Sequence, residues 1–583
     1  MKLTISRSKN AASLYVAKTV YENGFRTSKI VEKLGTEKAI REKLGGADPY
    51  EWAENYIAEL NRKEKEETRE SIVKYSPVKR IPKGSQKIYN GGYLFLQKIF
   101  HSLAIHKICQ EISERHKFTF NLESILSRLI YTRIIYPSSK AAACRLSDRF
   151  LEPKDFELCH IYRALGVIAA ESDFIQSELY KNSLKVSNRN TGVLYYDCTN
   201  FFFEIEQGEG VKQYGYSKEH KPNPIVGMGF FMDGDGMPLA YSIYEGNKNE
   251  QTTLRPLEQN ILSDFKLSRF VVCTDAGLSS TDNRKFNNKA GRSFITTQSV
   301  KKLKEYQEDW ALSPTGWSCP EKPVTIEGKK VAPKKPILYD ISKLDESEDQ
   351  NYTFYKERWI NEDGLEQRLI VTYSLKYRNY QRKIRAGQVE RAQKLINTNT
   401  TKIKKANAND FKRFISKTSV TSDGEAAEKE IYGIDAELIA GEEKYDGFYG
   451  VCTNLEDDVR EIIKVNHRRW EIEECFRIMK SEFKARPAYL SRDDRIKAHF
   501  ATCFMALMLY RQLEKKLGDK YTCHSIIECL RDFNFYKVEG EGYIPGYIRT
   551  DLTDELHDVF DFRTDNEIVN LRQMKKIFKE TKK

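Results

Sequence analysis

The sequence predicts a multidomain α/β protein, and three observations support this class. The chain has 583 residues, which is several times the usual length of one domain. Two mostly apolar runs, Val193–Thr199 and Phe270–Thr274, are typical of strands in the middle of a covered sheet. Between residues 93 and 185 the apolar side chains instead recur at helical spacing. For residues 191–299 the pattern predicts the element order β-β-β-α-β-α-β.

The first 190 residues precede the predicted sheet. Residues 1–75 are expected to form a small unit with a β-like start over Leu3–Tyr15 and a charged helix over Tyr50–Lys74. Residues 76–190 are expected to form a helical region that binds DNA or forms a dimer contact. The run Tyr136–Ser139, which contains a proline, should interrupt its helices.

The α/β unit is predicted in two parts. Residues 191–299 form the first part, in which strands Ile225–Met232 and Pro238–Tyr244 flank a tight Asp-Gly-Asp-Gly turn. Residues 456–517 form the second part, with one long helix over Val459–Phe483 and another over Arg495–Leu517. Residues 300–455, rich in short strand-like pieces, are interpreted as an inserted domain, and residues 518–583 as a helical tail.

Composition excludes several classes of protein. Charged residues make up 31% of the chain and the longest apolar run is only Cys503–Tyr510, so a membrane-embedded protein is excluded. The first residues lack a secretory signal, which predicts a cytoplasmic protein. Eleven cysteines without a C-x-x-C pair argue against a disulfide framework or a zinc site. No phosphate-binding glycine loop is present, so no nucleotide is expected.

Positive charge is concentrated in one segment. The net charge of the chain is +12, and residues 376–417 alone hold thirteen Lys or Arg against two acidic residues, a net +11. Such a segment is a candidate surface for DNA phosphates, with Arg382, Lys383 and Arg385 at its centre. A solvated helix is an equally good interpretation of the charge alone.

Two aspartates stand out by their settings. Asp197 lies inside an otherwise apolar strand, where a buried charge is costly unless a metal or a cation compensates it. Asp275 comes directly after a second such strand, at the edge where α/β sheets usually carry functional groups.

Glu473 is the third candidate carboxylate. On a helical wheel at ~100° per residue it falls at ~40° from Arg469. Arg477 lies at ~80° and Lys480 at ~20° on the same wheel, so one glutamate and three cations share a stripe. The neighbouring stripe is apolar and should be buried; it consists of Ile472, Phe476, Met479 and Phe483. Glu474 points away from the core, whereas Glu471 is not excluded by this geometry.

Three carboxylates from two strands and a helix would form an oxygen-only site that suits two Mg²⁺ or Mn²⁺ ions. Two such ions can activate a water or a 3′-hydroxyl and stabilise the leaving oxygen of a phosphodiester. The alternative is structural, because a helix glutamate flanked by arginines is most often a surface ion pair.

The run Arg469–Lys480 resembles the Y-x2-R-x3-E-x6-K signature of bacterial insertion-sequence DDE transposases, with Arg469, Glu473 and Lys480 as its R, E and K. The strands around Asp197 and Asp275 resemble the two aspartate strands of that family, and Tyr216-Ser217-Lys218 is also similar to it. The resemblance covers about residues 190–515. The signature tyrosine is absent, since Asn466 occupies its position.

The resemblance implies an RNase H-like core, with a mixed five-stranded sheet and helices on both faces, interrupted by a β-rich insertion. It implies a transposase that cuts and rejoins the ends of its own element by two-metal chemistry on Asp197, Asp275 and Glu473. Arg469, Arg477, Lys480 and Lys218 would bind DNA. The expected partners are double-stranded DNA, as terminal inverted repeats and target, and a second copy of the chain. Such a protein would act at the bacterial nucleoid.

Two other functions remain open at this point. One is a structure-selective nuclease with the same core, which would cut DNA and never join it. The other is a catalytically idle DNA-binding protein derived from a transposase, and the Asn466 departure favours this second alternative.

Overall fold

The computed structural model of the chain describes residues 1–8, 11–22, 25–67, 76–326, 329–331, 337–398, 410–420 and 429–583. These residues form two compact units. One comprises Met1–Ser85 with Val538–Glu541, and the other comprises Gln86–Lys537 with Gly542–Lys583. Each unit has a hydrophobic core of its own.

The first unit is a three-stranded antiparallel sheet followed by two helices. Its elements are β1 (Lys2–Ser8), β2 (Ala11–Glu22), β3 (Phe25–Thr36), α1 (Glu37–Lys43) and α2 (Pro49–Glu67), with β2 in the centre of the sheet. The core is small and centres on Leu14, Ile40 and Ala53. The sequence does not predict β3, because its residues 26–33 are exposed and lack the alternation of a half-buried strand. The end of the predicted helix at Lys74 lies outside the described residues.

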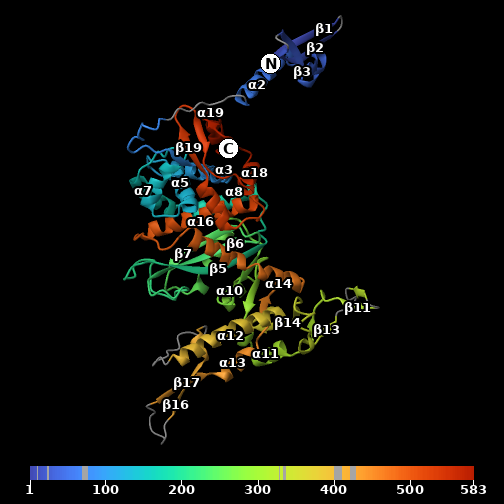
Figure 1. Cartoon of the computed structure of the whole chain (residues 1–583). Helices are drawn as coiled ribbons and strands as arrows, with labels where there is room; N and C mark the ends of the chain where they lie inside the picture. Colours follow the sequence, from blue (N-terminus) through green and yellow to red (C-terminus); the bar gives the residue numbers. More distant parts are fainter. Residues whose placement is uncertain are drawn as a thin grey trace. The chain divides into compact units, whose positions relative to one another are not determined.

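The second unit begins with the helical region that the sequence predicts. Its helices are α3 (Tyr93–Ser102), α4 (Ile105–Arg115), α5 (Leu122–Ile135), α6 (Lys140–Leu146), α7 (Leu158–Ala170) and α8 (Ser172–Val186). The expected break at Tyr136–Ser139 is confirmed, and the Ser139 hydroxyl caps the next helix by accepting from the Ala142 backbone N–H. Helix α16 (Asp493–Lys516) packs against α3, α5 and α7 (Figure 1).

Helix α16 is buried on all sides because residues 503–510 are apolar around its whole circumference. It joins the helical region to the sheet, since it also contacts β7. None of the helices in the described ranges is both long and apolar enough to cross a bilayer.

A large mixed sheet forms the middle of the second unit. Its first five strands are β5 (Val193–Phe202), β6 (Ile225–Asp233), β7 (Pro238–Glu245), β8 (Val271–Thr274) and β9 (Ser293–Gln298). They lie in the order β7-β6-β5-β8-β9, with β5, β8 and β9 parallel and β6 and β7 antiparallel to their neighbours. With α9 (Leu254–Asp264) and α10 (Thr281–Phe286), this confirms the predicted element order.

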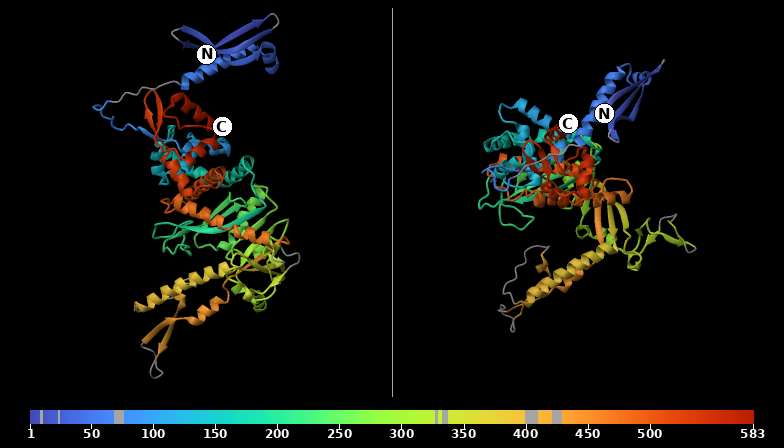
Figure 2. Two further views of the ribbon diagram at one scale, coloured as in Figure 1. Left: turned by 45° about the vertical axis from the view of Figure 1, so that its right-hand side comes forward. Right: turned by 45° about the horizontal axis from the view of Figure 1, so that its top comes forward.

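Both faces of these strands are covered, which explains their apolar sequences. On one face, Tyr195, Cys273 and Ile295 belong to the core shared with α15 (Trp470–Arg477) and α16. On the other face, Tyr196 and Val272 pack in a second core with α9. Figure 2 shows the orange C-terminal helices against the green strands.

The inserted segment continues the sheet beyond the five strands that the resemblance implies for the core. The added strands are β10 (Trp317–Ser318), β13 (Leu338–Tyr339), β14 (Phe354–Glu362), β15 (Leu365–Tyr373) and β18 (Phe448–Thr453). They extend it to ten strands in the order β13-β10-β14-β15-β18-β9-β8-β5-β6-β7. Strand β18 pairs antiparallel with β9 and so covers what would otherwise be an open edge.

The rest of the insertion projects from this extension. Helix α12 (Leu375–Asn397) carries the first part of the basic segment, and residues 399–409 of that segment lie outside the described residues. A hairpin of β16 (Ile415–Val420) and β17 (Lys429–Ile434) and the helix α13 (Ala436–Glu443) follow.

Two predictions are wrong in detail. The single helix expected over Val459–Phe483 is divided into α14 (Val459–His467), α15 and a π-helical turn at Ile478–Glu482. The C-terminal tail is not purely helical. It contains α17 (Cys523–Asp532), β19 (Asn534–Val538), β20 (Gly542–Pro545), α18 (Asp551–Phe560), β21 (Val569–Asn570) and α19 (Leu571–Glu580). These short strands escape prediction because each has five residues or fewer.

Candidate active site

Asp197 and Asp275 lie side by side on neighbouring parallel strands. Tyr195 of β5 is opposite Cys273 of β8, so the two aspartates, each two residues further on, reach the same level. Because side chains alternate along a strand, both aspartates project to the face on which α15 packs. Burial raises the pKa of Asp197 to about 6; the Lys218 ammonium opposes this rise and the Asp275 carboxylate adds to it.

Glu473 is carried over this face by helix α15. The helix is anchored by Cys475, which contacts the Met232 sulfur at 3.8 Å, and by Phe476, whose ring lies 5.7 Å from that of Phe230. The four side chains predicted to be buried here, Ile472, Phe476, Met479 and Phe483, are all buried. Glu473 itself is exposed, and no described residue forms a hydrogen bond or an ion pair with its carboxylate.

The cations on either side of Glu473 lie near Asp197. Arg469 opposes the rise in the pKa of Asp197, and the Asp197 carboxylate opposes the fall in the pKa of Lys480 that burial causes. Arg469 and Lys480 therefore both lie within electrostatic range of Asp197, and Glu473 lies between them along the chain. The two aspartates and the helix that carries Glu473 lie on one face of the sheet. The oxygens of the three carboxylates do not all lie within 4.8 Å of one another, as the ligands of a single metal ion would.

A hydrogen-bonded chain positions Arg469. Arg469 Nη1 donates to Thr297 Oγ1 at 2.8 Å, and that hydroxyl is 2.8 Å from the Tyr449 hydroxyl. The Arg469 Nε is buried without a hydrogen-bond partner among the described residues. Arg469 is therefore held by Thr297 within electrostatic range of Asp197.

Thr297 and Tyr449 were not singled out by the sequence. Thr297 lies near the end of β9, at the level of Asp275 on the neighbouring strand, so its place at the sheet edge is a signal that the sequence pattern could supply. Tyr449 offered none, because it belongs to the insertion and reaches the site only through the pairing of β18 with β9.

Two lysines border the aspartates on the other side. Lys218 donates a hydrogen bond to the Cys198 carbonyl oxygen and pairs with Glu250 at 3.3 Å. Lys480 pairs with Glu219 at 3.1 Å, and burial lowers its pKa to about 8. Both cations lie within electrostatic range of Asp197.

The other acidic residues of α15 have structural partners. Glu471 is buried, with Arg468 at 3.0 Å and Arg511 at 3.6 Å. Glu474 pairs with Arg477 at 2.6 Å, and Arg477 also reaches Glu482 at 3.4 Å. Arg477, predicted as a phosphate contact, is thus neutralised by two carboxylates in this structure.

The three central residues of the basic segment differ in their surroundings. Arg385 is buried and donates to both carboxylate oxygens of Asp446, and Arg382 lies 3.5 Å from the same carboxylate. Lys383 is exposed and has no ion-pair partner among the described residues. Its charge is therefore the one most available to DNA among these three.

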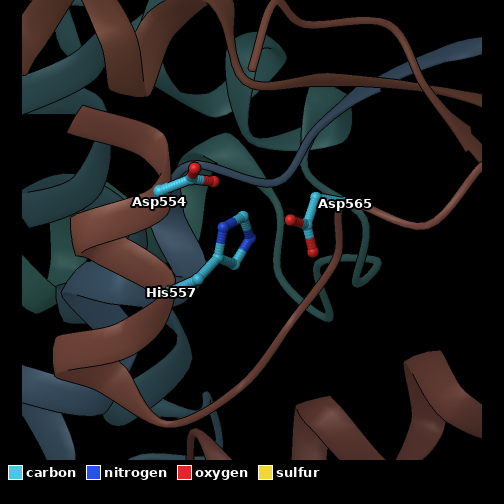
Figure 3. Close-up of side chains that lie close together, drawn as sticks. All are labelled: Asp554, His557 and Asp565. Atoms are coloured by element: carbon cyan, nitrogen blue, oxygen red, sulfur yellow. The ribbon is translucent and has the colours of Figure 1, made fainter. Parts of the chain in front are cut away.

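One other cluster holds atoms that could ligate a metal. Figure 3 shows Asp554 and His557 of α18 turned toward Asp565, and in the described part of the chain only these three ligand atoms all lie within 4.8 Å of one another. Arg549 and Arg563 each pair with both aspartates. Two arginines balance two carboxylates, so we interpret this cluster as an ion-pair network of the tail.

A comparison with protein families supplies the identity of this site. The family model described as "Transposase DDE domain" matches residues 201–509, which is more than half of the chain. The chain belongs to the DDE transposase family. It is a DNA transposase, an enzyme whose metal-dependent reaction cuts DNA and transfers strands. Asp275 and Glu473 lie inside the matched range of this transposase, and Asp197 lies just before it.

Other comparisons add little for this transposase. A search of curated proteins finds no match. Among solved structures, the chain is similar to a piggyBac transposase determined by cryo-EM as a synaptic complex with hairpin DNA. The identity is 8% and the TM-score 0.35, over 85% of this chain and 88% of that one. At this distance the likeness bears on neither the fold nor the site.

Proposed function

We propose that Asp197, Asp275 and Glu473 are the catalytic carboxylates of this transposase. The observation that carries the proposal is the position of Glu473 between Arg469 and Lys480, both of which lie within electrostatic range of Asp197. Glu473 is also exposed and unpaired, whereas Glu471 and Glu474 on the same helix are held by arginines. A free carboxylate on the helix that packs over the aspartate strands is suited to bind a cation.

The donor set fits hard divalent metal ions. All candidate ligands are carboxylate oxygens, and two of them are close enough for like charge to contribute to the raised pKa of Asp197. Two Mg²⁺ or Mn²⁺ ions held here would activate a water or a 3′-hydroxyl and stabilise the leaving oxygen of the phosphodiester. Arg469, Lys480 and Lys218 would hold the neighbouring phosphates in line.

The strand order supports a finer assignment of the fold. The order β7-β6-β5-β8-β9, with aspartates on the adjacent central strands β5 and β8, is that of an RNase H-like core. Together with the Arg469-Glu473-Lys480 spacing, it supports a bacterial insertion-sequence transposase of the Y-x2-R-x3-E-x6-K group. This enzyme would act at the nucleoid, in the cytoplasm.

The substrate would be the terminal inverted repeats of the element, followed by target DNA. Phosphate contacts position a duplex without reading its sequence, so base recognition is assigned to residues 1–190. Lys383 on α12 would contact flanking DNA. Two ends must be held together for excision, and we therefore propose that a homodimer forms the synaptic complex.

The test is an excision assay with Mg²⁺. The full-length protein is incubated with a plasmid that carries its own gene and several hundred flanking base pairs, as wild type, Glu473→Gln and Glu474→Gln. Glu474→Gln is the matched control, because it makes the same chemical change one residue away on a carboxylate already paired with Arg477. We expect excised element and joined products from wild type and Glu474→Gln, and neither from Glu473→Gln.

Three results would contradict the proposal. Normal excision by Glu473→Gln would remove Glu473 from the site. Nicking without joined products in wild type would favour a nuclease, and tight DNA binding without any cleavage would favour an idle DNA-binding protein.

A further inference from the structure

A basic pocket lies between the helical region and the segment that follows the π-helical turn. It has a volume of about 220 Å³ and is lined by residues of α5, α6, α16 and residues 484–490. Four of its lining residues are cations, namely Arg133, Lys140, Lys484 and Arg486, and none of its lining residues is Asp or Glu. Such a pocket attracts anions.

Lys140 is the central observation. It is only 5% exposed, and its Nζ has no hydrogen-bond partner among the described residues. The titratable groups nearest to it are Arg133, His499 and the thiol of Cys503, none of which is an acid that could form a salt bridge at neutral pH. The Ser138 hydroxyl, on the same pocket wall, is also buried without a partner.

Arg133 contributes fixed positive charge to this pocket. Its Nη1 donates to the Phe483 carbonyl oxygen at 3.1 Å and its Nη2 to the Ser138 carbonyl oxygen at 3.1 Å. These bonds hold its guanidinium in place, while its Nε has no partner among the described residues. Arg133 therefore cannot swing away to relieve its repulsion with Lys140.

An unpaired buried ammonium beside an immobile guanidinium is unfavourable, and burial and the Arg133 charge lower the pKa of Lys140 to about 7. An anion that joins the two cations would stabilise the charged form of Lys140. The unused donors here are Lys140 Nζ, Arg133 Nε and the Ser138 hydroxyl, and all three belong to residues that line the pocket. A tetrahedral oxyanion accepts hydrogen bonds in several directions and matches this arrangement.

We propose that this pocket binds a phosphate group, and that in the working complex the phosphate belongs to the DNA backbone. The second half rests on the proposed function. The link is Glu219, which pairs with Arg486 of the pocket and with Lys480 of the candidate active site. Glu219 thus joins the pocket to the candidate active site, and in the proposed complex the pocket is an additional anchor for the strand beyond the reacting phosphate.

The test uses the full-length protein as wild type, Lys140→Met and Lys107→Met. Lys107 is an exposed lysine of α4 outside the pocket and provides the matched control. Binding of inorganic phosphate is measured by isothermal titration calorimetry at constant ionic strength in chloride. We expect saturable binding to wild type and to Lys107→Met, and at least a tenfold weaker interaction with Lys140→Met. Circular dichroism establishes that each variant is folded.

The second arm separates DNA phosphate from free phosphate. The affinity for a labelled 40-base-pair duplex that carries the element end is measured against salt concentration without metal. Removal of one phosphate contact should lower the slope of log K against log salt by about 0.9 in Lys140→Met. A lower slope together with lost phosphate binding supports the DNA assignment, whereas an unchanged slope with lost phosphate binding overturns it and leaves a site for free phosphate.

Failure of this inference is distinguishable from failure of the proposed function. Absence of phosphate binding to the wild type, or equal binding to Lys140→Met, overturns the pocket whatever the excision assay shows. Neither arm requires cleavage, so an inactive active site would leave both measurements intact.

Discussion

Asn466 Nδ2 donates a hydrogen bond to the Tyr449 hydroxyl at 3.0 Å. Asn466 stands where the signature that the sequence resembles has a tyrosine, and a tyrosine from a different part of the chain is hydrogen-bonded to it. The same hydroxyl contacts Thr297, which receives a hydrogen bond from Arg469. Tyr449 therefore links Asn466 of α14 to the residue that holds Arg469.

We expect Tyr449 to be a positioning residue for Arg469. Tyr449→Phe removes the hydroxyl and leaves the ring, so it should lower the rate of strand cleavage about tenfold, the effect of ~1.4 kcal/mol, while DNA affinity stays unchanged. The measurement is single-turnover cleavage of an element-end duplex with Mg²⁺, beside an anisotropy titration. Tyr377→Phe is the control, because its ring lies 6.4 Å from that of Tyr449.

A lower melting temperature of Tyr449→Phe, together with weaker DNA binding, would assign Tyr449 a merely structural role. Equal rates for Tyr449→Phe and wild type would show that Thr297 alone holds Arg469.

Arg469 itself should be sensitive to a conservative change. Arg469→Lys keeps the charge but loses the planar set of donors that can serve Thr297 and a phosphate at once. We expect cleavage to fall by about a hundredfold, as for other positioned donors to a reacting oxyanion. Arg468→Lys changes the neighbouring residue, which pairs with Glu471, and should cleave within about threefold of wild type. Similar losses in both variants would argue against a specific contact by Arg469.

The sequence predicts the central strands and their aspartates because those strands are buried on both faces. Residues such as Tyr195 and Tyr196 pack in two different cores, and this leaves an apolar run in which Asp197 is conspicuous. The stripe around Glu473 follows from helical geometry in the same way, and the burial of Ile472 and Phe476 agrees with it.

What could not be predicted depends on contacts between distant parts of the chain. The pairing of β18 with β9 extends the sheet and delivers Tyr449, yet nothing local to Tyr449 records this partner. Arg385 appeared to be part of a DNA-binding surface, because its acidic partner Asp446 lies 61 residues away. The helix break before Arg469 is invisible as well, since residues 459–483 contain neither proline nor glycine.

The basic segment should contain cations of two kinds, of which one contributes to DNA binding and the other to the stability of the fold. Lys383→Ala removes an exposed charge, so it should weaken DNA binding and lower the slope of log K against log salt by about 0.9 with the melting temperature unchanged. Arg385→Ala leaves Asp446 buried without its main partner and should destabilise the protein by about 3–5 kcal/mol. Anisotropy titrations and urea unfolding measure the two effects. Loss of stability in Lys383→Ala would contradict the distinction.

Glu258 should make stability depend on pH. This side chain is fully buried between Asn287, which donates to it at 3.1 Å, and Arg292 at 3.7 Å. Burial raises its pKa from 4.5 to about 7, so the native state retains a proton that the unfolded chain has lost. The free energy of unfolding should therefore fall as the pH rises from about 4.5 to about 7, by on the order of 3 kcal/mol.

Glu258→Gln removes this titration and isolates it from all others. The free energy of unfolding of Glu258→Gln should fall less than that of wild type as the pH rises over that range. The variant should therefore gain stability relative to wild type up to about pH 7, and the difference should stay constant above that pH. Urea unfolding at pH 4.5, 5.5, 6.5 and 7.5 measures it. A difference that does not change with pH would mean that Arg292 keeps Glu258 ionised, because an ion pair at that position would cancel the cost of burial.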